Sequence, residues 1–206
     1  MIIEVCANSY ESAINAEQGG ADRIELCKDL HLDGLTPTYE TAKKTIDELS
    51  IPVFILIRPR EGDFNYSNEE YELMKADIVK FKEMGCKGIV SGVLNDDKTI
   101  DIERTKELVK LSRPLEFTFH RAFDVVKDPF NEIEELIKIG IDRVLTSGQK
   151  DKAMDGLVLL EKLNSISDKR IKIMPGSGIS KNNLKSFDLF REIHGSFKNE
   201  INSINF

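Results

Sequence analysis

Short runs rich in β-branched residues alternate along this chain with longer segments whose apolar residues recur every three or four positions. The first pattern predicts β-strands and the second predicts amphipathic α-helices. Strands that alternate with helices form a parallel sheet. Eight of them at this spacing favour a closed TIM (β/α)8 barrel, an α/β fold in one domain over residues 1–206, although periodicity alone also permits an open doubly wound sheet. The expected strands lie near residues 2–6, 23–27, 52–58, 88–93, 115–120, 143–147, 171–175 and 192–196.

A six-residue phrase that occurs three times supports this barrel. It begins at Gly20, Gly85 and Gly140, each time after a helix-like stretch and before a strand-like one. The copies start 65 and 55 residues apart. A βα unit takes about 30 residues, so each gap holds about two units. The phrase therefore marks every second strand of a repeating βα architecture.

Capping sequences mark several helix starts. Ser67-Asn-Glu-Glu70 is a capping box, and Asp128-Pro129 places an N-cap before a proline at the first helical position. Thr36-Pro37 and Ser180 predict similar starts. After the last strand only residues 197–206 remain. We therefore expect the eighth helix of the barrel to be short or absent.

Strand alternation predicts which side chains point into the barrel. The expected interior residues are Glu4, Cys6, Arg23, Glu25, Cys27, Arg58, Thr118 and His120, with His194 at the end of the last strand. Buried charges must be paired, because an unpaired one costs several kcal/mol. Glu4, Glu25 and Arg58 could form a structural ion network. A polar pocket is favoured instead, because the charges gather toward the carboxyl ends of the strands, where TIM barrels place their sites.

Composition narrows the classes of function. A net charge of −7 argues against a general binder of nucleic acid or of anionic membranes. The chain has no apolar run of about 18 residues, and its first residues lack the basic start of a signal peptide. The three cysteines, Cys6, Cys27 and Cys86, have no CxxC spacing, which indicates reduced thiols in a cytosolic protein.

Several sequence stretches resemble the CutC family of copper homeostasis proteins, and they run in order over nearly the whole chain. They are Glu4-Val-Cys6, Gly20-Ala-Asp-Arg-Ile-Glu-Leu-Cys27, Gly34-Leu-Thr-Pro37, Ile57-Arg-Pro-Arg60, Gly62-Asp-Phe64, Thr118-Phe-His-Arg-Ala-Phe-Asp124, Asp142-Arg-Val-Leu-Thr-Ser-Gly148, Ile173-Met-Pro-Gly176 and Ile193-His-Gly-Ser196. The resemblance implies a cytoplasmic TIM barrel that forms homo-oligomers and is linked to copper handling. It implies no established reaction.

The chain departs from this family pattern at two places. Members usually have three glycines after the Met-Pro pair, whereas this chain has Gly176-Ser177-Gly178. Members also continue past the His-Gly-Ser segment with a further loop and tail. If that loop closes the pocket, we expect the site of this chain to be open.

Copper is the first ligand to consider. Cu(I) is soft and favours thiolate and thioether ligands. Cys6 and Cys27 end adjacent strands, which lie about 5 Å apart, so two sulfur atoms could share one ion, with Met174 as a more distant candidate. The alternative is that both cysteines are small buried hydrophobic residues with inert thiols. Cys86 precedes its strand at the opposite end of the barrel and is expected to be structural.

Two other binding chemistries fit the same end of the barrel. His120, His194 and Glu25 could form a mixed metal site, although their spacing matches no zinc motif. A small anionic metabolite could bind the backbone of a glycine-rich loop near a helix that starts at Ser180. The residues expected at this anion site are Gly176, Ser177, Gly178, His194, Gly195 and Ser196, with Arg58, Arg60 and Arg121 adding positive charge.

Acid–base catalysis is the remaining chemistry. Glu25 and His120 could act as base and acid, with Arg58 tuning them and Asp124 orienting the imidazole. The alternative for His120 is a buried histidine with satisfied hydrogen bonds. The leading hypothesis is a cytoplasmic copper homeostasis protein that binds Cu(I) through Cys6 and Cys27. The alternatives are a lyase, isomerase or hydrolase acting on a phosphorylated or carboxylated metabolite, and a non-catalytic oligomeric scaffold.

Overall fold

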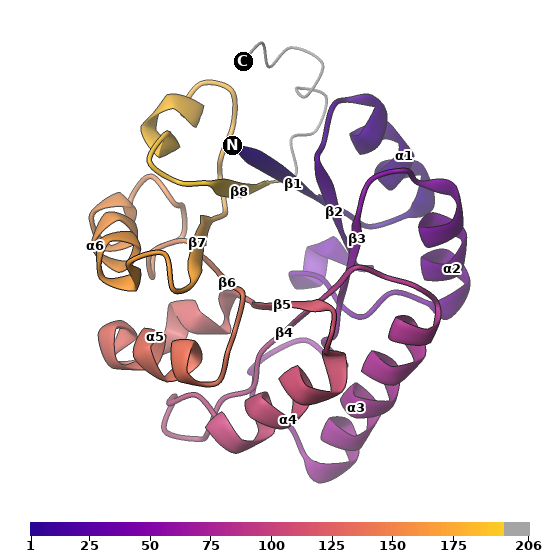
Figure 1. The fold of residues 1–206 in the computed structure, drawn as a ribbon, viewed down its shortest axis with the longest axis horizontal. Helices are drawn as coiled ribbons and strands as arrows, with labels where there is room; N and C mark the ends of the chain where they lie inside the picture. The colour runs from indigo at the N-terminus through magenta and orange to yellow at the C-terminus, as the bar shows by residue number, and fades with distance from the viewer. Residues whose placement is uncertain (196–206) are drawn as a thin grey trace.

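Within residues 1–195, eight strands form an inner ring and six α-helices surround them (Figure 1). The structure, a computed structural model, describes residues 1–195. The strands are β1 (Ile2–Ala7), β2 (Arg23–Leu26), β3 (Val53–Leu56), β4 (Gly88–Ser91), β5 (Glu116–Phe119), β6 (Arg143–Thr146), β7 (Lys172–Pro175) and β8 (Glu192–Gly195). Each lies at its expected position.

The sheet is parallel throughout and closes almost completely. Its hydrogen-bonded order runs β7-β6-β5-β4-β3-β2-β1-β8. The two end strands, β7 and β8, lie side by side and complete the ring. This closure confirms the predicted TIM barrel and excludes the open doubly wound sheet.

The helices cover the outside of the ring. They are α1 (Tyr10–Gln18), α2 (Tyr39–Glu48), α3 (Asn68–Glu83), α4 (Ile102–Ser112), α5 (Pro129–Lys138) and α6 (Leu157–Ser167). The capping box of Ser67 and Glu70 starts α3, and Asp128 caps α5. The N-cap of α2 is Thr38, two residues beyond the predicted Thr36. None of the helices within residues 1–195 is long and apolar enough to cross a membrane.

The predicted helix at Ser180 is wrong. Between β7 and β8 the described chain forms only a 3₁₀ turn, η3 (Leu184–Phe187), seen in gold in Figure 1. The Asn183 side chain accepts a hydrogen bond from the Ser180 amide and donates one to the Gly178 carbonyl. These local bonds compete with helical backbone bonds. The eighth helix, expected to be short or absent, would fall in residues 197–206, outside the described residues.

Side-chain alternation divides the strands between two apolar layers. Val53, Ile55 and Ile57 pack in the main core between the ring and the helices. Phe54 and Leu56 point the other way and form a smaller cluster inside the barrel with Cys27 and Val90. The predicted assignment of outward and inward residues on β3 is therefore confirmed.

The three copies of the repeated phrase meet at one aromatic ring inside the barrel. Arg23 and Arg143 hold the same place in the first and third copies, and their guanidinium carbons lie 4.7 and 5.0 Å from the centre of the Phe54 ring. Gly88 holds that place in the second copy. A Cβ atom on Gly88 would lie 2.4 Å from Cε2 of Phe54. The glycine therefore leaves room for a ring that the two arginines hold in place.

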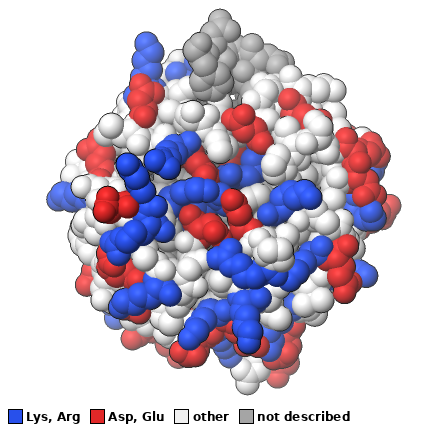
Figure 2. Space-filling view, in the orientation of Figure 1, with Lys and Arg blue, Asp and Glu red and all other residues white. Residues whose placement is uncertain are grey.

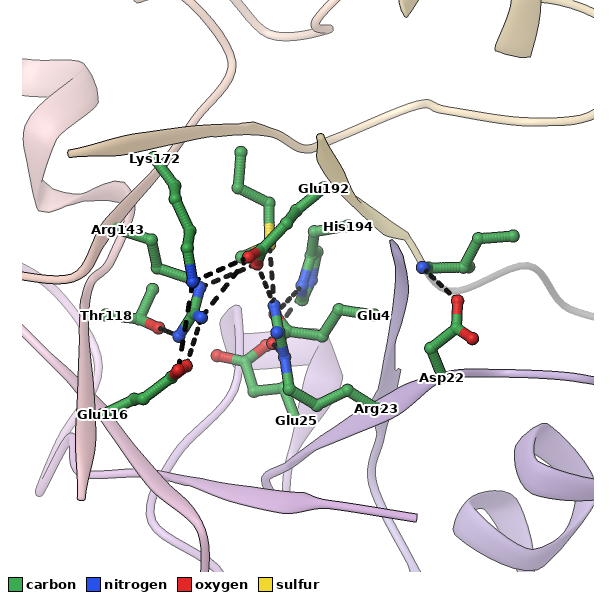
Figure 3. Close-up of polar contacts among 12 residues, drawn as sticks. Glu4, Asp22, Arg23, Glu25, Glu116, Thr118, Arg143, Lys172, Glu192 and His194 are labelled. Carbon is green, nitrogen blue, oxygen red and sulfur yellow. Dashed lines mark hydrogen bonds and ion pairs between the residues drawn. The ribbon is translucent and has the colours of Figure 1, made fainter. Parts of the chain in front are cut away.

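A buried ion network fills the centre of the barrel (Figure 3). Oε2 of Glu192 accepts hydrogen bonds from Arg23 at 2.6 Å and from Arg143 at 2.8 Å. Arg23 also binds Glu4 at 2.5 Å, and Arg143 also binds Glu116. Lys172 joins Glu192 at 3.2 Å.

Sequence reasoning named Glu4 but missed Arg143 and Glu192 as members of this network. The repeat contained a signal for Arg143. Asp142-Arg143 repeats Asp22-Arg23, and Arg23 was already predicted to point into the barrel. Burial alone would raise the pKa of Glu4, but Arg23 and His194 outweigh it and lower that pKa from 4.5 to about 2. Glu4 is therefore an ionised carboxylate inside the barrel, held by its cationic neighbours.

We expect Gly88→Ala to lower the free energy of unfolding by about 1–3 kcal/mol, because the new methyl group overlaps Phe54. Urea unfolding of both proteins measures the change. Phe54→Leu removes the overlapping ring atoms, so the double variant should lose less stability than the two single variants added together. Strictly additive losses would contradict this account.

We expect the stability of the protein to fall in acid through Glu4. Its pKa is about 2 in the folded protein against 4.5 for a free carboxyl, so the unfolded chain takes up the proton first. The stabilisation is complete above about pH 4.5 and is lost as the pH falls toward about 2. Urea unfolding at a series of pH values should show a flatter acid limb for Glu4→Gln than for the parent.

The exposed carboxylate Glu40 provides the matched control for this pH series. Glu40→Gln removes the same kind of charge without touching the network, so its acid limb should follow that of the parent. An acid limb of Glu4→Gln that also follows the parent would contradict the assigned role of Glu4.

Candidate functional site

His194, at the end of β8, links the ion network to the carboxyl end of the barrel. Its Nδ1 lies 2.8 Å from Oε1 of Glu4, and its Nε2 lies 3.4 Å from Oε2 of Glu25. Parallel ladders place these residues together, because β1 pairs with β2 on one side and with β8 on the other. Figure 3 shows the imidazole directed toward both carboxylates.

Burial and neighbouring charges shift the pKa of His194 in opposite directions. Burial lowers the pKa of His194, but Glu25 and Glu4 outweigh it and leave that pKa raised. Burial also raises the pKa of Glu25. Glu25 and Glu4 therefore favour the protonated form of His194, and burial favours the protonated form of Glu25.

The two predicted sulfur ligands do come together. Sγ of Cys6 lies 3.6 Å from Sγ of Cys27, and both cysteines are free thiols. The hydrogen bond with Cys27, burial and the nearby Glu25 raise the pKa of Cys6 well above its ordinary value. The contact between the two sulfur atoms and the apolar neighbours of Cys27 are consistent with a soft-metal site. They are equally consistent with a pair of packed thiols.

The prediction of a mixed metal site from His120, His194 and Glu25 is wrong for His120. Within residues 1–195, the one group of three candidate donors is Cys6, Glu25 and His194, whose ligand atoms all lie within 4.8 Å of one another. His120 is absent from this group because β5 lies across the ring from β1, β2 and β8. Sequence alternation placed all these side chains inside but could not rank their separations.

His120 occupies an aromatic pocket at the end of β5. Its ring centre lies 4.9 Å from that of Phe64, and its Nδ1 accepts a hydrogen bond from the Ala122 amide. Burial, followed by the charge of Arg58, lowers the pKa of His120 to about 3. The neutral ring leaves its buried Nε2 without a hydrogen-bond partner in the described residues. A charged general acid at neutral pH is therefore disfavoured at this position.

Arg58 holds two loops together. Its Nη1 donates to the carbonyl oxygens of Leu32 and Gly34, at 2.9 and 3.1 Å, and its Nη2 donates to that of Gly62 at 3.2 Å. The side chain is buried. Arg58 thus fixes the loops that follow β2 and β3, and its charge lowers the pKa of His120.

Asp124 organises the loop after β6 instead of orienting His120. Its carboxylate accepts hydrogen bonds from the amides of Ser147 and Gln149 and from the hydroxyl of Thr146. Arg121 forms an ion pair with it at 2.8 Å. The expected contact with the imidazole does not occur within residues 1–195, because these donors occupy the carboxylate.

The glycine-rich loop after β7 lies beside His194. A Cβ atom on Gly176 would lie 3.4 Å from Cβ of His194, so the two residues are close neighbours. Ser177 has a φ of +80°, and its hydroxyl donates to the Asp151 carbonyl at 2.6 Å. The side chain thus anchors the loop to the segment before α6. Binding of an anion by Gly176, Ser177, Gly178, His194 and Gly195 stays a prediction without the expected helix at Ser180, and Ser196 lies outside the described residues.

Acidic and basic side chains are interspersed on the face of the barrel seen in Figure 2. The close-up in Figure 3 shows that charges also alternate inside the barrel, where Arg23 pairs with Glu4 and Arg143 pairs with Glu192. The charged interior is therefore mostly self-neutralising. Within residues 1–195, no hydrogen bond joins a guanidinium to Cys6, Glu25 or His194.

Comparisons with known proteins agree with this architecture. The sequence profile of the CutC family matches residues 1–199. A human copper homeostasis protein cutC homolog is 49% identical over 184 residues, covering 89% of this chain and 67% of the human protein. A CutC family protein of Photorhabdus laumondii is 43% identical over 196 residues, covering 94% of this chain and 79% of its own.

Solved structures show the same fold. A CutC protein of Streptococcus agalactiae superimposes with a TM-score of 0.90 at 28% identity, covering 96% of this chain and 99% of its own. An aldolase superimposes with a TM-score of 0.69 at 16% identity, covering 95% of this chain and 89% of its own, which shows a shared barrel alone. The ring of eight strands, the matching profile and the close relatives lead to one conclusion: this chain belongs to the CutC family.

Proposed function

We propose that this CutC family protein binds Cu(I) between Cys6 and Cys27 as part of copper homeostasis. The observation that carries the proposal is the distance of 3.6 Å between the two sulfur atoms. An ion bound to two thiolates at about 2.3 Å each spans sulfur atoms up to about 4.6 Å apart. A small outward movement of either side chain would therefore admit one ion.

The chemistry of the surroundings also suits a soft ion. Cys27 packs with Phe54, Leu56 and Val90 inside the barrel, and Cys6 lies at the edge of this apolar cluster with partial exposure. An apolar wall disfavours hydrated hard cations, whereas Cu(I) prefers sulfur ligands in any setting. Partial exposure of Cys6 gives the ion a route to the pair. Binding must displace the thiol protons, since thiolates are the ligands.

Several further expectations accompany this proposal. A cytoplasmic location and a homo-oligomeric assembly follow from the family resemblance and stay predictions. Catalytic roles for Glu25, His120, Arg58 and Asp124 also stay predictions. The copper proposal is preferred to them because the thiols meet, whereas His120 and Asp124 bind separate loops.

A Cu(I) titration of the reduced protein against a competing chelator tests the proposal. We expect one equivalent to bind, and we expect the double variant Cys6→Ser, Cys27→Ser to lose at least about a hundredfold in affinity, because serine oxygen is a poor ligand for a soft ion. The double variant should keep the circular dichroism spectrum of the parent.

Cys86→Ala is the matched control, since it removes the third thiol, which lies buried outside the Cys6–Cys27 pair. Its affinity should equal that of the parent. Equal affinity of the double serine variant and the parent would refute the thiol pair as the copper site.

A further inference from the structure

A second set of metal donors lies beside the thiol pair and does not include Cys27. Sγ of Cys6, a carboxylate oxygen of Glu25 and a ring nitrogen of His194 all lie within 4.8 Å of one another. The three residues come from β1, β2 and β8, neighbouring strands whose ladders fix their register. The set is therefore built into the sheet rather than assembled from loops.

Hydrogen bonding orients the imidazole of His194 for this role. Its Nδ1 lies 2.8 Å from Glu4, and Arg23 binds the other oxygen of that carboxylate at 2.5 Å. A carboxylate held ionised by arginine can only accept, so Nδ1 of His194 carries the proton and donates. Nε2 faces Glu25 at 3.4 Å, and its lone pair becomes available to a cation once the proton on that side leaves. Metal-binding histidines commonly have this arrangement, in which a carboxylate behind the ring fixes its tautomer.

The facing donors need a positive charge between them. Nε2 of His194, the Glu25 carboxylate and the Cys6 sulfur all offer electron pairs once deprotonated, and His194 and Glu25 are buried while Cys6 is partly exposed. Protons or a cation must separate such groups, since like donors repel in a low-dielectric setting. The distance of 3.4 Å between Nε2 and Glu25 also matches a metal ion, because two ligands about 2.1 Å from a tetrahedral ion lie about 3.4 Å apart.

We propose that Cys6, Glu25 and His194 form a site for a borderline divalent cation of the zinc type. One thiolate, one carboxylate and one imidazole suit Zn²⁺, and three protein ligands leave its fourth position open to water or a small ligand. Binding releases the thiol proton of Cys6 and the proton held between Glu25 and His194 to the solvent. This site is independent of the copper proposal except that both use Cys6, so the two ions exclude each other.

Zinc titration of the reduced full chain against a chromophoric chelator tests the site. We expect one equivalent to bind to the parent, with His194→Gln and Glu25→Gln each weakening the affinity at least about tenfold. Cys27→Ser should keep the zinc affinity within about threefold, because Cys27 lies outside the set. In the Cu(I) titration the pattern should reverse, with Cys27→Ser losing affinity and His194→Gln keeping it. The two proposals can thus fail separately.

Two further experiments test whether zinc binds at these three residues. His31→Gln removes an imidazole from the loop after β2, outside the set, and should leave zinc binding unchanged. Replacement of zinc by Co²⁺ should give a thiolate-to-metal charge-transfer band that disappears in Cys6→Ser. If His194→Gln does not fold, as judged by thermal melting, Glu25→Gln and the Co²⁺ spectrum still decide the matter.

Two results would overturn the proposal. The first is the absence of stoichiometric zinc binding to the folded parent. The second is the opposite dependence, in which Cys27→Ser abolishes zinc binding while His194→Gln keeps it, because the ion would then occupy the thiol pair alone.

Discussion

The carboxylate of Glu192 is the contact on which the closed barrel depends. The hydrogen-bonded order of the strands runs from β7 round to β8, which leaves these two strands as the ends of the ladder within residues 1–195. Glu192 on β8 binds Lys172 on β7, Arg143 on β6 and Arg23 on β2. Ion pairs therefore join strands that the backbone ladder leaves apart. Removal of such a buried partner typically costs about 3–5 kcal/mol, because the remaining charges stay in the interior.

The same network determines how the carboxyl end of the barrel can be used. Arg23 neutralises Glu4 from one side, and His194 contacts Glu4 from the other. Since Arg23 is occupied by Glu4 and Glu192, no guanidinium is left within hydrogen-bonding distance of Glu25 in the described residues. Arg23, Arg143, Glu4 and Glu192 thus form the ion network at the centre of the barrel. The predicted network of Glu4, Glu25 and Arg58 does not form within the described residues, because Arg58 binds loop carbonyl oxygens instead. Cys6, Glu25 and His194 lie beside this network on β1, β2 and β8.

The sequence predicted this fold well because its signals are local. Alternation in each strand, the capping box at Ser67 and the recurring phrase all depend on neighbours in the chain. The inward direction of Arg23 and Glu25 followed from the same alternation. Partners across the barrel depend on closure and stagger, which no single segment records. Arg58 illustrates the difference: its inward position was correct, but its bonds go to the carbonyl oxygens of Leu32, Gly34 and Gly62. Every residue has a backbone carbonyl group, so the sequence does not show which of them will accept a hydrogen bond.

The position of Cys6 between two donor sets gives the site a basis for discrimination between ions. Toward Cys27 the thiol meets a second sulfur and apolar side chains; toward Glu25 and His194 it meets oxygen and nitrogen donors. A soft ion gains from the first direction, and a borderline ion gains from the second. Because one thiolate cannot serve both geometries fully, occupation by either ion removes a ligand from the other. Selectivity in this barrel would then follow from competition for one shared sulfur rather than from the shape of a preformed cage.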